Sequence, residues 1–483
     1  MKFSSIPKTI NFQDLLEHKV HSLSPTDYLN IRLKSKFIYL EDLIATPIYG
    51  KEVGTSNYME NSKLKFIRTK CLQDTSILLN LDDAIGLNPL SFRNFNLKKG
   101  DILLVKDSNI GEVCYIEKDL PNYTISGGVV KLNINNKLDK FYVIGIMKSS
   151  FFKEQIDLMT PKGATIRHSK DNFKHTKIPI PHDTAIIDKV SILTQSLINK
   201  EVELRNKFEQ INILIEDELK ENQLPYKFDY QTLSFDDLIK LNRFDTGLYT
   251  KKFKEIEFLV KNYKNGSKTI IQQGFYSIRG QNLAVSVIGK SIYSDNYKEN
   301  SYQLILPTNI SKYGTTNNII YFGNKNKLIS FKNSDIIFGA EATFVSFIPL
   351  NYKGKVTTNY HGTILRHDNE NIYKKIFIKC MLDWFREKGI LKAYSVGGNG
   401  GSFSTKYWKV LKFPLFSNDK QKDIANLYYN PNDEYLTHMF DFDIKNYMNI
   451  DTQITKDSGI LDLDEQIKSI KSIIDTEIRK MVE

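Results

Sequence analysis

The sequence predicts an α+β fold: two tandem related α/β domains, separated and followed by long helices packed as an antiparallel coiled coil. Three observations lead to this prediction. Short motifs of the first half return in the same order in the second half. Each half contains short apolar runs typical of strands, and each is followed by a segment with apolar residues at helical spacing.

The duplication rests on four pairs of motifs with unequal loops between them. A repeat of roughly 200 residues is a duplicated domain and not a solenoid unit. Two related domains with different loops suit a protein that reads two different targets at a fixed separation. The pairs are residues 12–16 (FQDLL) with 235–239 (FDDLI), 66–69 (FIRT) with 277–280 (SIRG), 98–103 (KKGDIL) with 332–337 (KNSDII), and 177–180 (KIPI) with 412–415 (KFPL).

The first domain is predicted over residues 1–185. Residues 102–105 follow a Gly-Asp turn and are a buried strand, 125–132 are a strand with a Gly break, and 141–157 have helical periodicity. Pro179 and Pro181 end the domain. The predicted parts that follow are helical spacer 1 at 186–224, the second domain at 225–418, a linker or insertion at 419–459, and helical spacer 2 at 460–483.

Both predicted spacers carry apolar residues at helical spacing. Sustained heptads with charged residues between them favour a coiled-coil partner helix, whereas one long helix packed on its own domain is the simpler alternative. We therefore expect the two spacers to pack antiparallel and to serve as partner-binding helices. The positions that define them are Val190, Leu197, Leu204 and Ile211 in the first, and Leu463, Ile467, Ile470 and Ile474 in the second.

Composition is ordinary for a soluble protein, but the charge is not. Lys and Arg number 67 against 56 Asp and Glu, a formal net charge of +11, which favours polyanion partners or simply solubility. No apolar stretch is long enough for a membrane span, and no signal-like apolar core opens the chain. Cys71, Cys114 and Cys380 are scattered and fit buried thiols in a reducing compartment. We expect a cytoplasmic protein.

The motifs of several enzyme classes are missing from the sequence. There is no P-loop, and Asn430-Pro431-Asn432 lacks the second proline and the aromatic ring of a nucleotide-methylating motif. His and Cys do not fall at zinc-ligand spacing, so we expect no metal site and no catalytic residue. Asp335, Glu341 and Lys353 resemble a nuclease set. Asp335, however, matches the turn residue Asp101 of the first domain, which favours a structural role.

The order of these motifs resembles the specificity subunit of a type I restriction-modification system. The features that carry the resemblance are the repeated strand around Arg68 and Arg279, the Gly100-Asp101-hydrophobic landmark, and the proline-containing exits at 177–181 and 412–416, the second followed by 420–425 (KQKDIA). The first exit lacks the family's Glu-Gln pair, and the second has a single proline.

The resemblance implies two target recognition domains that read an asymmetric bipartite site in double-stranded DNA. It also implies docking of two methyltransferase subunits and of restriction/translocase subunits. The cofactors S-adenosylmethionine, ATP and Mg would then be held by those partners, and none by this chain. A specificity subunit of a type II-like or other phage-defence complex is an alternative, as are a nucleic-acid-acting enzyme using Asp335 and Glu341, and a protein-binding scaffold.

Base contacts are expected on polar loops that follow strands, because base edges are read by hydrogen bonds in the grooves. Arg68 and Arg279 lie in the repeated strand motif, which favours a shared role in a salt bridge or a phosphate contact. The other candidate DNA-binding residues are Lys106, Ser108, Asn109, Thr165, Arg167, Ser169 and Lys170 in the first domain, and Arg366, Asn399, Ser402, Ser404, Thr405 and Lys406 in the second.

Overall fold

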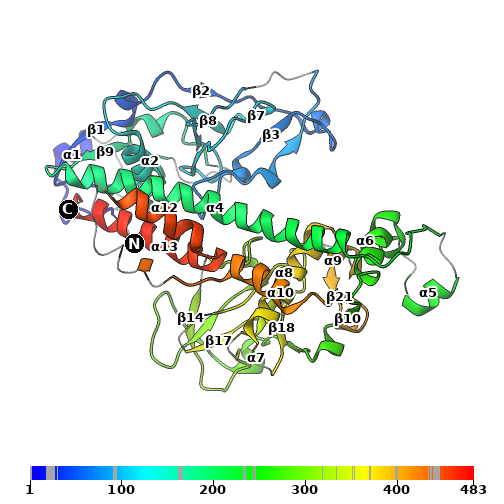
Figure 1. The fold of residues 1–483 in the computed structure, drawn as a ribbon. Coiled ribbons are helices and arrows are strands. Elements are labelled where there is room, and N and C mark those ends of the chain that lie inside the picture. The colour runs from blue at the N-terminus through cyan, green and yellow to red at the C-terminus, as the bar shows by residue number, and fades with distance from the viewer. Residues whose placement is uncertain are drawn as a thin grey trace. The chain divides into compact units, whose positions relative to one another are not determined.

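In the computed structural model of the protein, the chain forms two compact units of mixed helix and sheet (Figure 1). Unit 1 comprises Met1–Glu203, Asp433–Lys456 and Glu465–Glu483, and unit 2 comprises Leu204–Asn432 and Asp457–Asp464. The residues described are 3–17, 28–29, 31–90, 95–160, 167–231, 235–241, 243, 246–317, 319–332, 334–350, 352, 354–368, 371–397, 401–432, 434–435, 438 and 446–482.

Unit 1 is organised around strand β5, whose residues Ile-Leu-Leu-Val are all buried. It lies in a sheet of order β2-β8-β5-β6, beside a sheet of order β4-β3-β7 in which β3 and β7 run parallel. β1 and β9 pair antiparallel and join the start of the domain to its end. The strands are β1 (Lys36–Tyr39), β2 (Ile48–Tyr49), β3 (Lys65–Ile67), β4 (Ile85–Gly86), β5 (Ile102–Val105), β6 (Val113–Tyr115), β7 (Tyr123–Ile125), β8 (Val129–Leu132) and β9 (Lys177–Ile180).

Unit 2 repeats these sheets. Their orders are β11-β18-β15-β16 and β12-β14-β13-β17, and β10 pairs with β21. The strands are β10 (Ser267–Thr269), β11 (Tyr276–Arg279), β12 (Ile292–Ser294), β13 (Tyr302–Leu304), β14 (Ile320–Gly323), β15 (Ile336–Gly339), β16 (Ser346–Phe347), β17 (Lys355–Thr357), β18 (Gly362–Arg366), β19 (Ser395–Val396), β20 (Ser402–Phe403) and β21 (Lys412–Pro414).

Helices occur before, between and after the strands. The helices are α1 (Phe12–Glu17), α2 (Lys140–Lys148), α3 (Ser150–Met159), α4 (Ala185–Glu221), α5 (Phe235–Leu241), α6 (Lys251–Lys261), α7 (Val285–Ile288), α8 (Ile372–Glu387), α9 (Ile390–Tyr394), α10 (Asn418–Tyr428), α12 (Tyr447–Asp457) and α13 (Ile460–Lys480).

The strand registers show that the two domains are copies of one framework. Ile102 of β5 pairs with Leu132 of β8, and Ile336 of β15 pairs with Leu365 of β18. β3 and β7 are parallel, as are β13 and β17. The predicted duplication and mixed α/β class are therefore confirmed by strand order and not only by motif similarity.

One of the four motif pairs was matched wrongly. Residues 66–69 leave β3, whose counterpart in strand order is β13, whereas residues 277–280 belong to β11, the counterpart of β2. Gly50 and Gly280 hold equivalent places, because a Cβ would lie 2.1 Å from the Ser126 carbonyl oxygen in one and 2.0 Å from that of Asn359 in the other. Arg68 and Arg279 are therefore not equivalent, and Arg279 precedes Gly280 as Tyr49 precedes Gly50.

The second domain has an extension that the first lacks. Helix α7 and strand β12 lie between β11 and β13, and β12 adds to the edge of its sheet beside β14. Insertion at a sheet edge leaves the order of the remaining strands unchanged.

The two predicted spacer helices exist, and they run antiparallel where they meet within unit 1 (Figure 1). Lys189 near the start of α4 binds Glu477 near the end of α13 (2.8 Å), and Lys200 farther along α4 binds Gln466 farther back along α13 (2.9 Å). α4 contains neither Pro nor Gly over its 37 residues, which allows it to remain helical.

The heptad residues do not form an exposed partner-binding face. All eight side chains are at most 6% exposed in the chain by itself. They contribute to the chain's own core, whereas the prediction of partner-binding helices required them to be exposed. The eight are Val190, Leu197, Leu204, Ile211, Leu463, Ile467, Ile470 and Ile474.

The end of each long helix meets the beginning of a domain through the same backbone bond. In unit 1, the Lys34 amide donates to the Met481 carbonyl oxygen at the end of α13 (2.9 Å). In unit 2, the Lys264 amide donates to the Asn222 carbonyl oxygen just after α4 (2.9 Å). In each unit, the end of a long helix is therefore bonded to the segment just before the first strand.

The segment predicted as a linker at 419–459 is partly helical. It contains most of α10 and all of α12. In unit 2, the Asp462 carboxylate accepts hydrogen bonds from the amides of Asn430 (2.8 Å) and Gly459 (3.1 Å). Asp462 thereby caps the start of α13 and ties it to the segment that follows α10. Burial raises the pKa of Asp462 to about 6.

A buried ion pair fastens α12 to α4 inside unit 1. The ammonium of Lys200 lies 2.9 Å from the Asp451 carboxylate, and the two side chains are 0% and 1% exposed. Thr455 accepts from the same ammonium, and Ser196 donates to Asp451. Burial lowers the pKa of Lys200, an effect that Asp451 partly offsets. A pair of this kind is costly to break, because either partner alone is a buried charge.

We expect Lys200→Met to lower the free energy of unfolding by about 3–5 kcal/mol, since it leaves the Asp451 carboxylate unpaired. The double variant Lys200→Met/Asp451→Leu should lose much less, because it removes both charges. Urea unfolding followed by circular dichroism measures both. Equal losses in the single and double variants would contradict the assignment.

We expect Asp462→Asn to change the pH dependence of stability. The raised pKa means that the stabilisation from Asp462 is fully present below the ordinary carboxyl pKa and is lost as pH rises through about 6. The melting temperature of Asp462→Asn relative to the unmodified chain should therefore increase from about pH 4 to about pH 7. Asp423→Asn, at an exposed site on α10, is the control and should give a flat difference.

Candidate nucleic-acid interface

The loop that follows the central strand is closed in the same way in both domains. In the first, the Lys106 amide donates to the Gly128 carbonyl oxygen (2.9 Å), and Lys106 accepts from the Ser169 amide (2.8 Å). In the second, the Ala340 amide donates to the His361 carbonyl oxygen (3.0 Å), and the Ala340 carbonyl oxygen accepts from the Phe403 amide (2.7 Å). These matched bonds align the two loops residue by residue.

The residue at the tip of each loop has a left-handed backbone. Ser108 has φ 72° and its amide donates to the Arg167 carbonyl oxygen (2.9 Å). Ala342 has φ 56° and its amide donates to Gly401 (3.2 Å). A positive φ is uncommon for residues other than glycine, so the shared conformation marks a loop geometry common to both domains.

The first domain presents a basic and polar surface at this loop. Lys106 pairs with Asp107 (3.1 Å), and Asp107 also binds the Nδ1 of His168 (2.8 Å). Ser108, Asn109, His168 and Lys170 are exposed. Of the residues predicted to bind DNA here, the structure therefore brings Lys106, Ser108, Asn109, Arg167 and Lys170 to one surface.

Two residues of this surface have structural partners. The guanidinium of Arg167 binds both the carboxylate and the carbonyl oxygen of Asp157. The Asn109 amide donates to the carbonyl oxygens of Thr69 (3.3 Å) and Leu72 (3.1 Å). An open hollow lies beside Asn109, and its lining consists of Thr69, Lys70, Leu72, Gln73, Asp74, Ser108 and Asn109.

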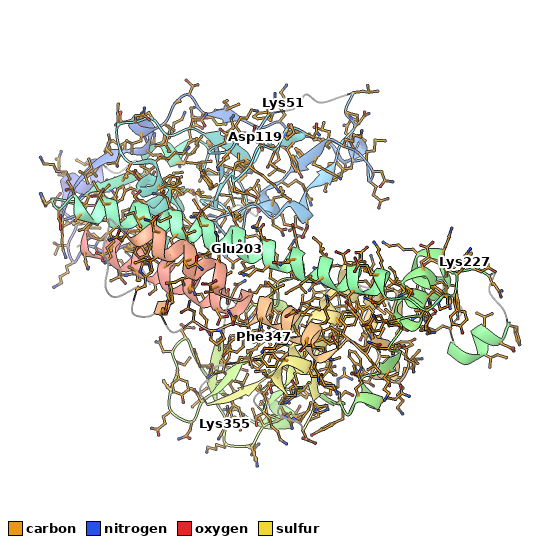
Figure 2. The ribbon with its side chains drawn as sticks, viewed as in Figure 1. Lys51, Asp119, Glu203, Lys227, Phe347 and Lys355 are labelled. Carbon is orange, nitrogen blue, oxygen red and sulfur yellow. The ribbon has the colours of Figure 1, made fainter. Side chains whose placement is uncertain are left out.

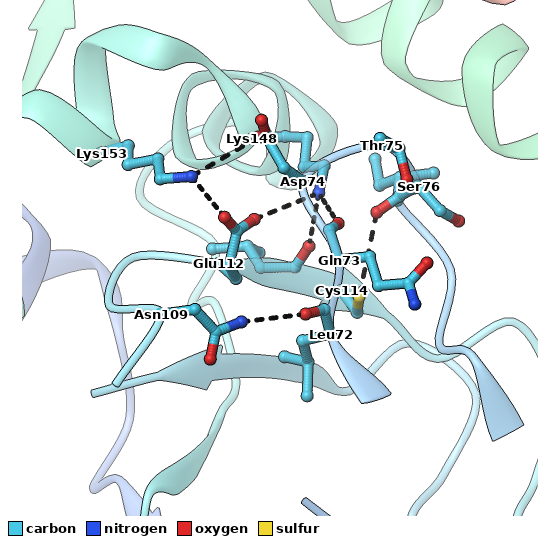
Figure 3. Close-up of polar contacts among 12 residues, drawn as sticks. Leu72, Gln73, Asp74, Thr75, Ser76, Asn109, Glu112, Cys114, Lys148 and Lys153 are labelled. Atoms are coloured by element: carbon cyan, nitrogen blue, oxygen red, sulfur yellow. Dashed lines mark hydrogen bonds and ion pairs between the residues drawn. The ribbon is translucent and has the colours of Figure 1, made fainter. Parts of the chain in front are cut away.

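The far wall of the hollow is held by two lysines (Figure 3). The buried Lys148 donates to the carbonyl oxygen of Gln73 (2.7 Å), and Lys153 bridges Asp74 (3.8 Å) and Glu112. Burial lowers the pKa of Lys148. Two helix-borne cations thus fix the loop that faces Asn109.

The same loop is anchored on the long helices of unit 1. The Glu201 carboxylate of α4 accepts from the Ser76 hydroxyl (2.6 Å) and from the Ile77 amide (3.0 Å). Lys471 of α13 donates to the Thr75 carbonyl oxygen (2.6 Å) and lies 3.3 Å from Glu201. The helices therefore position the hollow as well as supporting the domain.

The second domain presents different side chains on the same framework. Ala340, Ala342 and Gly401 replace Lys106, Ser108 and Arg167. The backbone of Ser402 forms an antiparallel β-bridge with that of Glu341, as the backbone of His168 does with that of Asp107.

An aromatic and charged group lies beside this second loop. The exposed Arg279 donates to the Tyr360 carbonyl oxygen (3.1 Å), with its guanidinium 5.4 Å from the Tyr360 ring. Tyr360 lies against His361, with ring centroids 3.9 Å apart, and His361 binds Glu341 (2.6 Å).

Labelled side chains of both units include charged ones (Figure 2). Lys51 and Asp119 of unit 1 and Lys355 of unit 2 are among the exposed ones. Lys51 and Gln281 hold equivalent places, because the Lys51 amide donates to Ile125 (3.1 Å) and the Gln281 amide to Thr358 (2.9 Å). The segment that follows β2 therefore carries a charge, from Lys51, that the segment following β11 lacks at the matching Gln281.

Two predicted DNA-binding residues are removed from the candidate interface. Ser169 is 1% exposed, and its hydroxyl donates to the Lys106 carbonyl oxygen (2.9 Å). Arg366 is bound by the Asp335 carboxylate (2.6 Å) and by the Ser330 carbonyl oxygen (2.9 Å). Both side chains bind the framework of their own domain.

The remaining residues predicted to bind DNA differ in exposure and in their hydrogen-bond partners. Arg68 follows β3 and donates to the Asp83 carbonyl oxygen (3.4 Å). Ser404 is half-buried and begins a short 3-10 helix, in which Thr405 and Lys406 are exposed. Thr165 and Asn399 lie outside the described residues.

Asp335 has the structural role that its match to Asp101 predicted. It accepts from the Lys332 amide (2.8 Å), as Asp101 accepts from the Lys98 amide (2.8 Å), and it binds Arg366. Glu341 instead binds His361, so the two acids do not act together as the nuclease alternative requires. Within the described ranges, no three His, Cys, Asp or Glu side chains gather as they would around a metal ion.

Sequence reasoning missed the acid–histidine pairs at the two loops. Asp107 lies between the selected residues Lys106 and Ser108, and His168 lies between Arg167 and Ser169, but neither was selected. Their only sequence signal is that an acid occurs at the same distance from the Gly-Asp or Ser-Asp turn in both domains. Among the described helices, none has the length and apolarity needed to cross a membrane.

Comparison with known proteins gives a match over the first domain and α4. The family model of the type I restriction modification DNA specificity domain matches residues 34–210. No curated protein matches. The S subunit of a type I restriction-modification system from M. genitalium is 13% identical, with a TM-score of 0.39, over 94% of this chain and 97% of that chain. The HsdS subunit from Thermoanaerobacter tengcongensis is 12% identical, with a TM-score of 0.27, over 92% and 96%.

The matched segment begins just before β1 and ends within α4. It therefore contains β5, the loop that follows it and the hollow beside Asn109. Over residues 34–210, the chain is similar to the type I restriction modification DNA specificity domain.

Proposed function

We propose that the chain is the DNA sequence-recognition subunit of a type I restriction-modification complex and binds an asymmetric bipartite target in double-stranded DNA. Residues 1–185 and 225–418 are proposed as its two target recognition domains. One observation carries the proposal: the same loop framework occurs twice with different side chains at matched positions. Two such surfaces suit two unlike half-sites.

The chemistry of the surfaces supports binding to DNA. The first carries Lys106 and Lys170, and the second carries Arg279 with Tyr360. Lysine binds phosphate as a point charge, and arginine binds base edges and aromatic faces. A formal net charge of +11 adds long-range attraction to a polyanion.

We propose that catalysis resides on partner subunits. Two methyltransferase subunits would carry S-adenosylmethionine, and restriction/translocase subunits would carry ATP and Mg. Because the heptad residues are buried, docking is proposed at the domain flanks. The matched short helices α1 and α5 expose Phe12 and Leu16, and Phe235 and Ile239, respectively. Equal apolar groups in both halves suit two copies of one partner.

Mapping of methylated DNA motifs in cells with and without this chain tests the function. We expect a bipartite motif to disappear when the chain is removed, because the methyltransferase then has no target reader. The purified chain with S-adenosylmethionine should transfer no methyl group. An unchanged set of motifs, or methyl transfer by the chain alone, would be incompatible with the proposal.

We expect Lys170→Gln to weaken DNA binding by the complex equally for all sequences, because it removes a phosphate contact. The slope of log affinity against log salt should fall by about one. Lys99→Gln is the matched control, since Lys99 is exposed at the opposite end of β5. Affinity measured over a salt series distinguishes the two, and equal effects would argue against this surface.

A further inference from the structure

The loops of the two domains retain one chemical feature although their other side chains differ. Asp107 and Glu341 hold the same place, two residues beyond the matched ends of β5 and β15. Each carboxylate binds the Nδ1 of a histidine, His168 at 2.8 Å and His361 at 2.6 Å. The acid is therefore common to both domains.

The two histidines come from different parts of the framework. His168 lies in the segment before β9, at the place of Ser402, whereas His361 lies in the turn between β17 and β18, at the place of Gly128. The same pairing is thus built in two ways, which is unexpected if the histidine served only the local backbone. Both domains therefore have an imidazole beside the acid at the loop surface.

The loops do not need the pairs for closure. Backbone bonds from Lys106, Ser108 and Ser169 close the first loop, and the matching bonds close the second. The imidazole of His168 is 57% exposed, and that of His361 is 37% exposed. The two imidazoles therefore face outward from loops that are already held. The Glu341 carboxylate is 39% exposed, whereas the Asp107 carboxylate is 17% exposed and also pairs with Lys106 (3.1 Å).

The chemistry of the pair fits one class of ligand group. A carboxylate accepts hydrogen bonds and repels phosphate, so on a DNA-facing loop it matches an exocyclic amino group, N4 of cytosine or N6 of adenine, in the major groove. The hydrogen bond to Nδ1 orients the imidazole and turns Nε2 away from the acid, toward DNA.

We propose that Asp107 and Glu341 are the specificity-determining residues of the two half-sites. Each carboxylate accepts a hydrogen bond from the amino group of a cytosine or adenine, and His168 and His361 are the positioning residues that aim them. This inference rests on the proposed function. Asp107 acts in one half-site and Glu341 in the other.

The test uses the whole chain with its methyltransferase partner in cells and maps the methylated motif. Asp107→Asn should relax one base position in one half-site and leave the other half-site unchanged, and Glu341→Gln should do the reverse. Each variant is the control for the other. Asp119→Asn, an exposed acid paired with Lys98 at the opposite end of β5, should change neither half-site.

The loss of base discrimination is measured by binding to DNA duplexes that differ only at the relaxed position. We expect discrimination between the amino-bearing base and its competitors to fall roughly five- to 150-fold, the range of one base contact. His168→Gln should reduce this discrimination while leaving the dependence of binding on salt unchanged. Thermal melting of each variant verifies that it remains folded.

Two outcomes are separable. If the unmodified chain directs a motif but the folded Asp107→Asn and Glu341→Gln variants direct the same motif with the same discrimination, the inference is wrong and the proposed function stands. If no motif depends on the unmodified chain, the proposed function itself fails.

Discussion

The backbone bonds that close the loop after the central strand are the constraint on which the candidate interface depends. They join the strand end to two other segments, one from the turn before β8 or β18 and one from the residues before β9 or β21. Because main-chain atoms make these bonds, the side chains are free to differ. Lys106 and Ala340 occupy the same place, and so do Arg167 and Gly401. A framework held by its backbone can present two unlike surfaces without a change of fold.

The long helices hold parts of the candidate interface in unit 1. Glu201 of α4 and Lys471 of α13 bind the loop that walls the hollow beside Asn109. The buried Lys200–Asp451 pair fixes α12 on α4. Buried polar contacts of this kind tolerate little displacement, because a shift leaves a charge without its partner. The helices therefore fix the position of the loop beside the recognition surface of unit 1.

Equivalent residues of the two domains were hard to match by sequence. Main-chain register, and not side-chain identity, defines the equivalence of β2 with β11 and of β3 with β13. The motif around Arg68 resembles that around Arg279, yet the residue at the place of Arg279 is Tyr49. Short motifs of three or four residues recur by chance, whereas a strand order with one parallel pair does not. Ser169 and Arg366 show a related limit, because polarity in a loop does not reveal whether the loop buries that side chain.

The sequence by itself determined the duplication, the α+β class, the two long helices and the structural role of Asp335. These follow from local periodicity and from repeated turn residues, which depend on neighbours in the chain. Tertiary structure alone decided which residues share a surface: it buried the heptad positions, engaged Arg366 and Ser169 in the framework, and joined Asp107 to His168 and Glu341 to His361. Such pairings link residues that are far apart in the chain, and their geometry is fixed only when the strands take their register.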